Sequence, residues 1–199
     1  MVVQRTWQEM NGFACSELEV DEPRKSIVRS KSFAQKINTI ESLQAAISHH
    51  VASGAAKLRQ QNSRAHVLTV AIKTNPFSQD KQYKGVKSVS LPLGSNDTLE
   101  LNHLAQKLLT DVYRQGFHYK KCGIELSGIE SISNQQFNLF DTPKISDNPA
   151  LMATIDDINK TFGKGAIKLG TEYLSNDWQM RRQLISSRFT TRWEELLVV

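Results

Sequence analysis

Two pairs of adjacent side chains in this 199-residue chain could in principle hold a metal or move protons. His49 and His50 form one pair, and Asp156 and Asp157 form the other; both lie in segments with helical periodicity. Adjacent residues of a helix point about 100° apart, so neither pair predicts a shared metal ion. The glycine-rich segment GKGAIKLG lacks P-loop spacing. We therefore predict no catalytic residue, no cofactor and no metal site.

The remaining reactive side chains are two cysteines. Their spacing predicts no reaction, but it bears on the cellular compartment of the protein. Cys15 and Cys122 are far apart and lack the spacing of metal ligands, so we expect reduced thiols in a cytoplasmic protein. No apolar run reaches the roughly 18 residues of a membrane span, so no membrane partner is expected. The N-terminus also lacks the apolar core of a signal peptide.

The middle of the chain carries an excess of positive charge. Residues 23–125 hold 16 Lys or Arg and 6 Asp or Glu, whereas the remainder holds 9 and 14. Within this region, RKSIVRSKSF (24–33) alternates at period two, and as a strand it would present Arg, Lys and Ser to phosphates. A polyanion partner is one interpretation; a solvated lysine-rich surface with a charge-protected edge strand is the other.

The elements that would position these cations form a recognisable order. Strand, helix, strand, strand, helix and strand patterns follow one another at 24–33, 39–60, 65–77, 83–94, 98–115 and 120–129. This order predicts an α+β, ferredoxin-like split βαβ (βαββαβ) fold, with a four-stranded antiparallel sheet and two helices on one face. RNA-recognition modules share this order, but their base-stacking aromatics are missing from HVLTVAIKT. A small extended or helical tail follows the sheet.

A short apolar cluster lies outside these predicted elements. The segment SNQQFNLFDTP (133–143) holds Phe137, Leu139 and Phe140 in polar surroundings, directly before Pro143. Nothing nearby could bury these three side chains locally. They would either fold back on the sheet domain or enter a partner.

Four separated motifs carry a family resemblance. RKSIVRSKSF, VAIKTNPFSQDKQY, QQFNLFD and DWQMRRQLISSRFTTRWEELL occur in the order typical of the C-terminal half of the UmuC family. This family comprises the catalytic subunits of bacterial DNA polymerase V, which are Y-family, error-prone translesion polymerases. The resemblance covers essentially the whole chain and implies a part in SOS mutagenesis and in the repair of damaged DNA.

The resemblance divides the chain into four parts. Residues 1–22 resemble the end of the polymerase thumb and a tether, 23–130 the little finger domain, 131–146 a linker, and 147–199 the C-terminal extension. In the family, the little finger holds primer–template duplex mainly through the DNA backbone. The phosphate-facing positions expected here are Lys25, Arg29, Ser30, Lys31, Ser32, Lys73, Thr74, Lys84 and Lys87.

The same resemblance implies protein partners. Gln136, Phe137, Asn138, Leu139 and Phe140 resemble the pentapeptide that docks into the sliding clamp, with Phe137 standing where Leu is usual. The extension is expected to meet the processed UmuD dimer and the RecA filament. The candidate contacts are Trp178, Met180, Arg181, Arg188, Phe189 and Arg192, although Trp178 and Phe189 could instead pack on the preceding helix.

One departure from the family limits the activity expected of this chain. The palm and fingers, with the carboxylates that bind two magnesium ions, should precede residue 1. Without them we expect DNA and clamp binding but no DNA synthesis by this chain alone. The chain is then a fragment of a translesion polymerase, a non-catalytic decoy that competes for clamp and DNA, or the remnant of a decayed gene.

Overall fold

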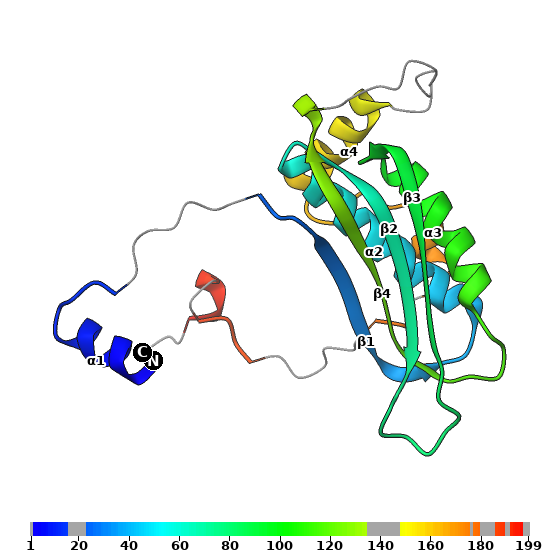
Figure 1. The fold of residues 1–199 in the computed structure, drawn as a ribbon, viewed down its shortest axis with the longest axis horizontal. Helices are drawn as coiled ribbons and strands as arrows, with labels where there is room; N and C mark the ends of the chain where they lie inside the picture. The colour runs from blue at the N-terminus through cyan, green and yellow to red at the C-terminus, as the bar shows by residue number, and fades with distance from the viewer. Residues whose placement is uncertain are drawn as a thin grey trace.

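The computed structural model describes residues 2–15, 23–134, 148–175, 177–179, 186–189 and 192–196. Its helices are α1 (Val2–Met10), α2 (Ile40–Gln60), α3 (Thr98–Val112) and α4 (Pro149–Thr161), and its strands are β1 (Ile27–Ile37), β2 (Ser63–Thr74), β3 (Lys84–Ser95) and β4 (Tyr119–Ser131). Short 3-10 turns follow at η1 (Ile132–Asn134), η2 (Gly170–Tyr173) and η3 (Trp193–Glu195). The predicted α+β class and the order of the six central elements are confirmed (Figure 1).

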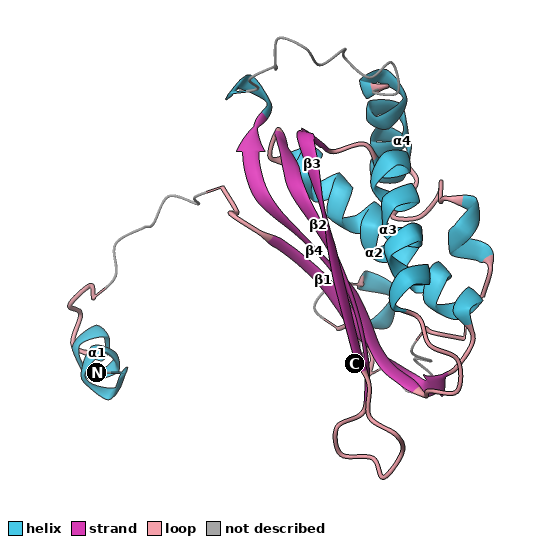
Figure 2. Cartoon of the chain, turned by 45° about the vertical axis from the view of Figure 1, so that its right-hand side comes forward, coloured by secondary structure: helices cyan, strands magenta, loops and turns pink. Residues whose placement is uncertain are grey.

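The four strands form one antiparallel sheet in the order β1-β4-β2-β3. The connection through α2 joins β1 to β2 across β4, and the connection through α3 joins β3 to β4 across β2. Each connection thus spans one intervening antiparallel strand, which is the split βαβ arrangement. Figure 2 shows α2 and α3 on one side of the sheet; the opposite side is called the open face below.

The hydrophobic core lies between the sheet and these two helices. Ile47 and Leu58 of α2, Leu101 of α3, Leu68 of β2 and Leu126 of β4 are all fully buried. Burying each such side chain contributes about 1.5–3 kcal/mol. The helices and the sheet therefore stabilise each other, and the open face is left available for other contacts.

The helical layer also anchors the beginning of the tail. The Arg59 guanidinium, at the end of α2, donates from Nε and Nη2 to the two Asp156 carboxylate oxygens of α4, at 2.6 and 2.8 Å. Its Nη1 donates to the Asn96 carbonyl at 2.7 Å and to the Thr98 hydroxyl at 2.9 Å. Met152 of α4 is also buried, at 2% exposure. Asp156 thus has a structural role as the partner of Arg59.

Candidate nucleic-acid interface

A row of three lysines crosses the open face of the sheet. Lys73 of β2 lies opposite both Lys84 of β3 and Lys121 of β4, and Lys121 lies opposite Ser32 of β1. Opposite residues of antiparallel strands project from the same face. Ile72, the neighbour of Lys73, is fully buried on the helix side, so the row projects from the open face. We refer to Lys73, Lys84 and Lys121 as the lysine row.

The charge of the lysine row is not balanced within the described structure. No carboxylate forms an ion pair with any of its three ammonium groups among the described residues. Glu125, on the same face of β4, lies two rows away, opposite Thr69. Like charges placed directly opposite one another destabilise a sheet, so the row is suited to an anion that comes from outside the sheet.

Hydroxyl groups continue this surface beyond the lysines. Ser30, Thr69 and Ser88 lie on the open face, and the hydroxyls of Thr69 and Ser88 are hydrogen-bonded at 2.9 Å. Ser30 and Thr69, together with Lys73 and Lys84, border a shallow hollow of about 300 Å³. Lysine ammonium and hydroxyl groups are common ligands of nucleic-acid phosphates.

A glycine allows the edge strand to approach this hollow. A Cβ atom added at Gly123 of β4 would lie 2.7 Å from the Arg29 carbonyl oxygen and would collide with the side chain of Ser30. Only glycine leaves room for β1 at this point. The position of β1, and therefore of Ser30 and Ser32, depends on this close approach.

Two of the predicted phosphate contacts on β1 point away from the open face. Arg29 and Lys31 share the side of the strand that buries Ile27 and Phe33. The Lys31 ammonium lies 5.8 Å from the centre of the Trp178 ring, on the helix side. The strand expected to face phosphates therefore presents its polar side chains on two faces, because side chains alternate along a strand: Ser30 and Ser32 lie on the open face, and Arg29 and Lys31 lie on the helix side.

Two further predicted contacts have structural partners instead. Lys87 lies on the helix side of β3, and its ammonium pairs with the Asp111 carboxylate of α3 at 2.7 Å. Thr74 is 4% exposed, and its hydroxyl donates to the Gln82 side chain at 2.9 Å. These two side chains have partners within the chain and do not face the lysine row.

The other predicted contacts lie where a phosphate could reach them. Lys25 is exposed just before β1, Ser30 and Ser32 are exposed on the open face, and Lys84 is exposed in the lysine row. Lys121 was missed by the sequence interpretation. Its signal was present, because Cys122 and the apolar residues after it form the buried set of β4, which leaves Lys121 on the opposite face.

A second group of cations lies along the helix side of β1. The pKa of Lys57 on α2 is lowered, chiefly by the positive charge of Arg29, then by burial and by the charges of Arg24 and Lys164. Arg29 also packs against Gly54, one turn before Lys57, and its Nε atom is buried without a hydrogen-bond partner. The edge strand is therefore flanked by positive charge on both of its sides.

Trp178 of the tail is buried against α2, so its side chain is not accessible to a partner protein. Its side chain is 3% exposed, and its ring centre lies 5.1 Å from that of His49 and 6.0 Å from that of His50. Burial, followed by the charges of His49, Lys31 and Arg29, lowers the pKa of His50 to about 4. Trp178 is therefore buried within the chain, but the rings that it contacts belong to α2 and not to the directly preceding helix named in the alternative.

The rest of the predicted protein contacts are only partly described. Phe189 is 46% exposed, and the Arg192 guanidinium donates to the Glu195 carboxylate at 3.2 Å. Arg188 is exposed, whereas Met180 and Arg181 lie outside the described residues. The clamp motif Gln136, Phe137, Asn138, Leu139 and Phe140 also lies outside them.

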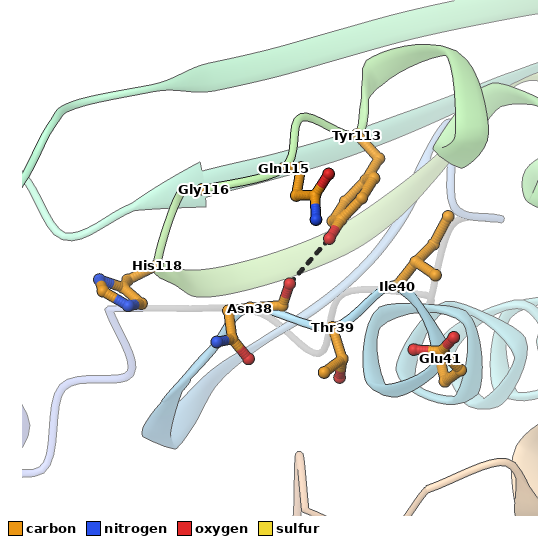
Figure 3. Close-up of a pocket in the computed structure, with 8 residues that line it drawn as sticks. All are labelled: Asn38, Thr39, Ile40, Glu41, Tyr113, Gln115, Gly116 and His118. Atoms are coloured by element: carbon orange, nitrogen blue, oxygen red, sulfur yellow. Dashed lines mark hydrogen bonds between the residues drawn. The ribbon is translucent and has the colours of Figure 1, made fainter.

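The described residues also form a pocket away from the open face. A pocket at the start of α2 is bordered by residues 38–41 and by Tyr113, Gln115, Gly116 and His118 (Figure 3). The Tyr113 hydroxyl donates to the Asn38 carbonyl at 2.7 Å across it. No group of three or more His, Cys, Asp or Glu side chains could hold a metal in the part of the chain that the structure describes, so no magnesium site is assigned to it. None of the described helices is long and apolar enough to cross a membrane.

Two sequence families match this chain. One, described as the impB/mucB/samB family C-terminal domain, matches residues 24–139. The other, described as a domain of unknown function (DUF4113), matches residues 149–199. The first match contains the whole sheet domain, including the lysine row, and the second contains α4 and the tail.

Curated relatives extend the similarity over the whole chain. Protein UmuC of Salmonella typhimurium is 33% identical over 203 residues, which cover 100% of this chain and 48% of that protein. Protein MucB of Salmonella typhimurium is 34% identical over 200 residues, which cover 98% of this chain and 47% of that protein. The chain spans about half the length of the curated relatives it matches.

Among solved structures, the insertion ternary complex of Dbh DNA polymerase is similar to this chain with a TM-score of 0.43 and 12% identity. The match covers 56% of this chain and 32% of that one. This likeness is too low to support an argument about the site.

Proposed function

The chain belongs to the impB/mucB/samB family, and on this premise we propose that it is the DNA-holding part of an UmuC-like, Y-family translesion polymerase. The observation that carries the proposal is the lysine row on the open face, which has no acidic partner among the described residues. The row would bind the phosphate backbone of primer–template duplex. The family's link to SOS mutagenesis and DNA repair supports the same function.

Backbone binding suits such a protein for a physical reason. Phosphate contacts supply affinity and orientation, but they carry no information about the bases. A polymerase that crosses lesions must hold DNA of any sequence, including damaged bases. Three lysines and several hydroxyls on an open sheet face meet this requirement, because ammonium and hydroxyl groups can bind phosphate oxygens of any sequence.

The proposal is tested by the salt dependence of duplex binding in two lysine variants of one strand. Lys84→Ala removes an ammonium from the lysine row, whereas Lys87→Ala removes one that is paired with Asp111 on the helix side. We expect Lys84→Ala to lower the slope of log affinity against log salt by about 1. Replacing all three lysines should lower the slope by about 3 and the affinity at 0.1 M salt by about 100-fold.

The matched control decides between the open face and a general charge effect. Lys87→Ala should leave both slope and affinity within about twofold of the unmodified chain. Equal losses in the two single variants would show that net charge alone drives binding, and would contradict the assignment of DNA to the open face.

We further propose that residues 136–140 dock into the sliding clamp. The sequence Gln136-Phe137-Asn138-Leu139-Phe140 supports this, because a glutamine amide followed by apolar side chains can enter a pocket as a short linear motif. Calorimetry of the chain with the clamp should detect binding that is lost in the double variant Leu139→Ala, Phe140→Ala. Retention of binding by that variant would exclude this segment.

The tail supports a further set of partners. Phe189, together with Arg188 and Arg192, remains the candidate surface for the processed UmuD dimer and the RecA filament. Aromatic and guanidinium groups are enriched at protein interfaces, which supports the proposal. Trp178 is removed from this surface because it is buried against α2.

A further inference from the structure

The loop that joins β2 and β3 at the end of the sheet where the lysine row lies carries an isolated aromatic side chain. Lys73 and Lys84 are the last paired residues of these two strands, and the loop between them contains Phe77. Phe77 is 94% exposed, the highest value among the large apolar side chains that the structure describes. Figure 1 shows this loop projecting beyond the end of the sheet.

The backbone around Phe77 is held in place although its ring is free. The Phe77 N–H donates to the Asn75 side-chain oxygen at 3.2 Å, and the Ser78 N–H donates to the Asn75 carbonyl at 3.1 Å. The Gln82 amide donates to the Ser78 carbonyl at 2.8 Å and to the Asp80 carbonyl at 3.0 Å. The loop therefore presents the ring with its backbone already ordered, which lowers the entropy cost of a contact.

A contact with β1 fixes the loop relative to the sheet. The Lys36 ammonium pairs with the Asp80 carboxylate at 2.6 Å and donates to the Ser78 hydroxyl at 3.5 Å. His118, just before β4, lies 3.8 Å from the same carboxylate. The one acidic side chain of the loop is thus engaged by nearby residues, while Lys81 adds a further positive charge.

The surroundings of Phe77 favour a nucleobase over a protein surface. A protein interface needs a contiguous apolar centre, but the residues from Ser78 to Gln82 are all polar. A nucleobase needs only one exposed ring to stack on, with cations nearby for its phosphates. Phe77 offers the ring, and Lys73, Lys81 and Lys84 offer the charges.

We propose that Phe77 is a stacking platform for an unpaired base of the single strand that leaves a duplex held by the lysine row. The inference rests on the proposed binding of DNA to the open face, and it adds a site for the single-stranded part of the same DNA. Stacking on an aromatic ring tolerates any base, which agrees with the sequence-independent phosphate contacts.

The test compares two kinds of DNA, blunt and overhang, with three variants of the full chain by fluorescence anisotropy. The DNA is a blunt duplex or the same duplex with a six-nucleotide overhang, prepared with either 5′ or 3′ polarity. We expect Phe77→Ala to weaken binding of one overhang substrate by roughly 5- to 100-fold, and to change blunt-duplex affinity less than twofold. Phe77→Trp should retain overhang binding, and its added indole fluorescence should be quenched by the overhang.

Phe162→Ala provides a matched control, because Phe162 is also exposed, at 77%, but lies just after α4 in the tail. It should bind both DNA molecules like the unmodified chain. Equal overhang affinity in Phe77→Ala and in the unmodified chain would overturn the proposal, and would leave protein contact as the remaining use of this ring. Failure of the unmodified chain to bind even blunt duplex would instead contradict the proposed function.

Discussion

The two faces of the sheet use the same residue type in opposite ways. On the helix side, Lys87 pairs with Asp111 and Lys31 lies over the Trp178 ring, so these cations have partners within the chain. On the open face, Lys73, Lys84 and Lys121 lie opposite one another and pair with no carboxylate among the described residues. The difference teaches that the count of basic residues does not distinguish the two faces, whereas the presence or absence of local partners does.

The comparison also separates stability from binding. Changes on the helix side should lower the free energy of unfolding and leave the DNA affinity of the folded chain unchanged. Changes in the lysine row should lower the DNA affinity. They should not lower the free energy of unfolding, because removing one of several like charges relieves repulsion. Three changes test the part of this division that concerns stability, one at a constraint shared by both faces and two in the helical layer.

The largest loss of stability is expected at Gly123, where β1 and β4 approach each other closely. Gly123→Val forces a side chain into Ser30 and the Arg29 carbonyl, which should separate β1 from β4. We expect the free energy of unfolding to fall by about 3 kcal/mol, and duplex affinity to fall as well. Urea denaturation and anisotropy measure the two quantities. Gly170→Ala is the control, since nothing lies within 4 Å of a Cβ added there; a similar loss in the control would contradict a local steric cause.

A pH-dependent effect of similar size is expected on the helix side at His50. Its pKa is about 4 in the folded chain against 6.5 for an unperturbed histidine, so between these values the unfolded chain binds more protons. The stabilising contribution of neutral His50 is complete above pH 6.5 and is lost as the pH falls toward 4. Over this range it amounts to about 3 kcal/mol.

Denaturation at a series of pH values measures this contribution. His50→Leu should flatten the curve between pH 6.5 and 4. The same pH dependence in His50→Leu and in the unmodified chain would exclude His50 as the titrating group.

The smallest effect is expected for the anchor between α2 and α4. Asp156→Asn removes the charge that Arg59 meets at 2.6 Å, and should cost about 1–2 kcal/mol of stability. Asp157→Asn changes an exposed neighbour and should cost less than about 0.5 kcal/mol. Thermal unfolding ranks the two variants; the opposite ranking would mean that the tail is held by other contacts.

The sequence predicted the elements of the sheet domain well, because each of them has a clear period. The strand at β2, for example, alternates Leu68, Val70 and Ile72 with a smaller set, and it is central as expected. The helix predicted to 115 ends at Val112, where Tyr113 leaves helical geometry. Element boundaries shift in this way because they depend on contacts that a periodic pattern does not contain.

The faces of the cations were predicted less well, for a different reason in each strand. Lys87 is separated from Val89 and Leu91 by even numbers of positions, so the alternation of the strand already places it on their face, which is the helix side. In β1, both alternating sets are polar, and only the later residue Phe33 identifies the side of Arg29 and Lys31. A strand whose two faces are equally polar leaves its orientation to tertiary contacts.

The docking of the tail could not be predicted from local patterns at all. Arg59 and Asp156 are 97 positions apart, and the Ser48 and Thr171 hydroxyls that bond at 2.7 Å are 123 apart. No periodicity connects such residues. Their partnership depends on how α4 and η2 pack against the helical layer, and only the folded structure contains that information.

The location of DNA is tested most directly by methyl NMR of valine-labelled chain during titration with blunt duplex. Val28 and Val86 lie on the open face and are 59% and 49% exposed, whereas Val51 and Val112 are buried on the helix side. We predict concentration-dependent shifts of the Val28 and Val86 methyl signals, with those of Val51 and Val112 unchanged. Shifts confined to Val51 and Val112 would place the DNA on the helical layer and contradict the role assigned to the lysine row.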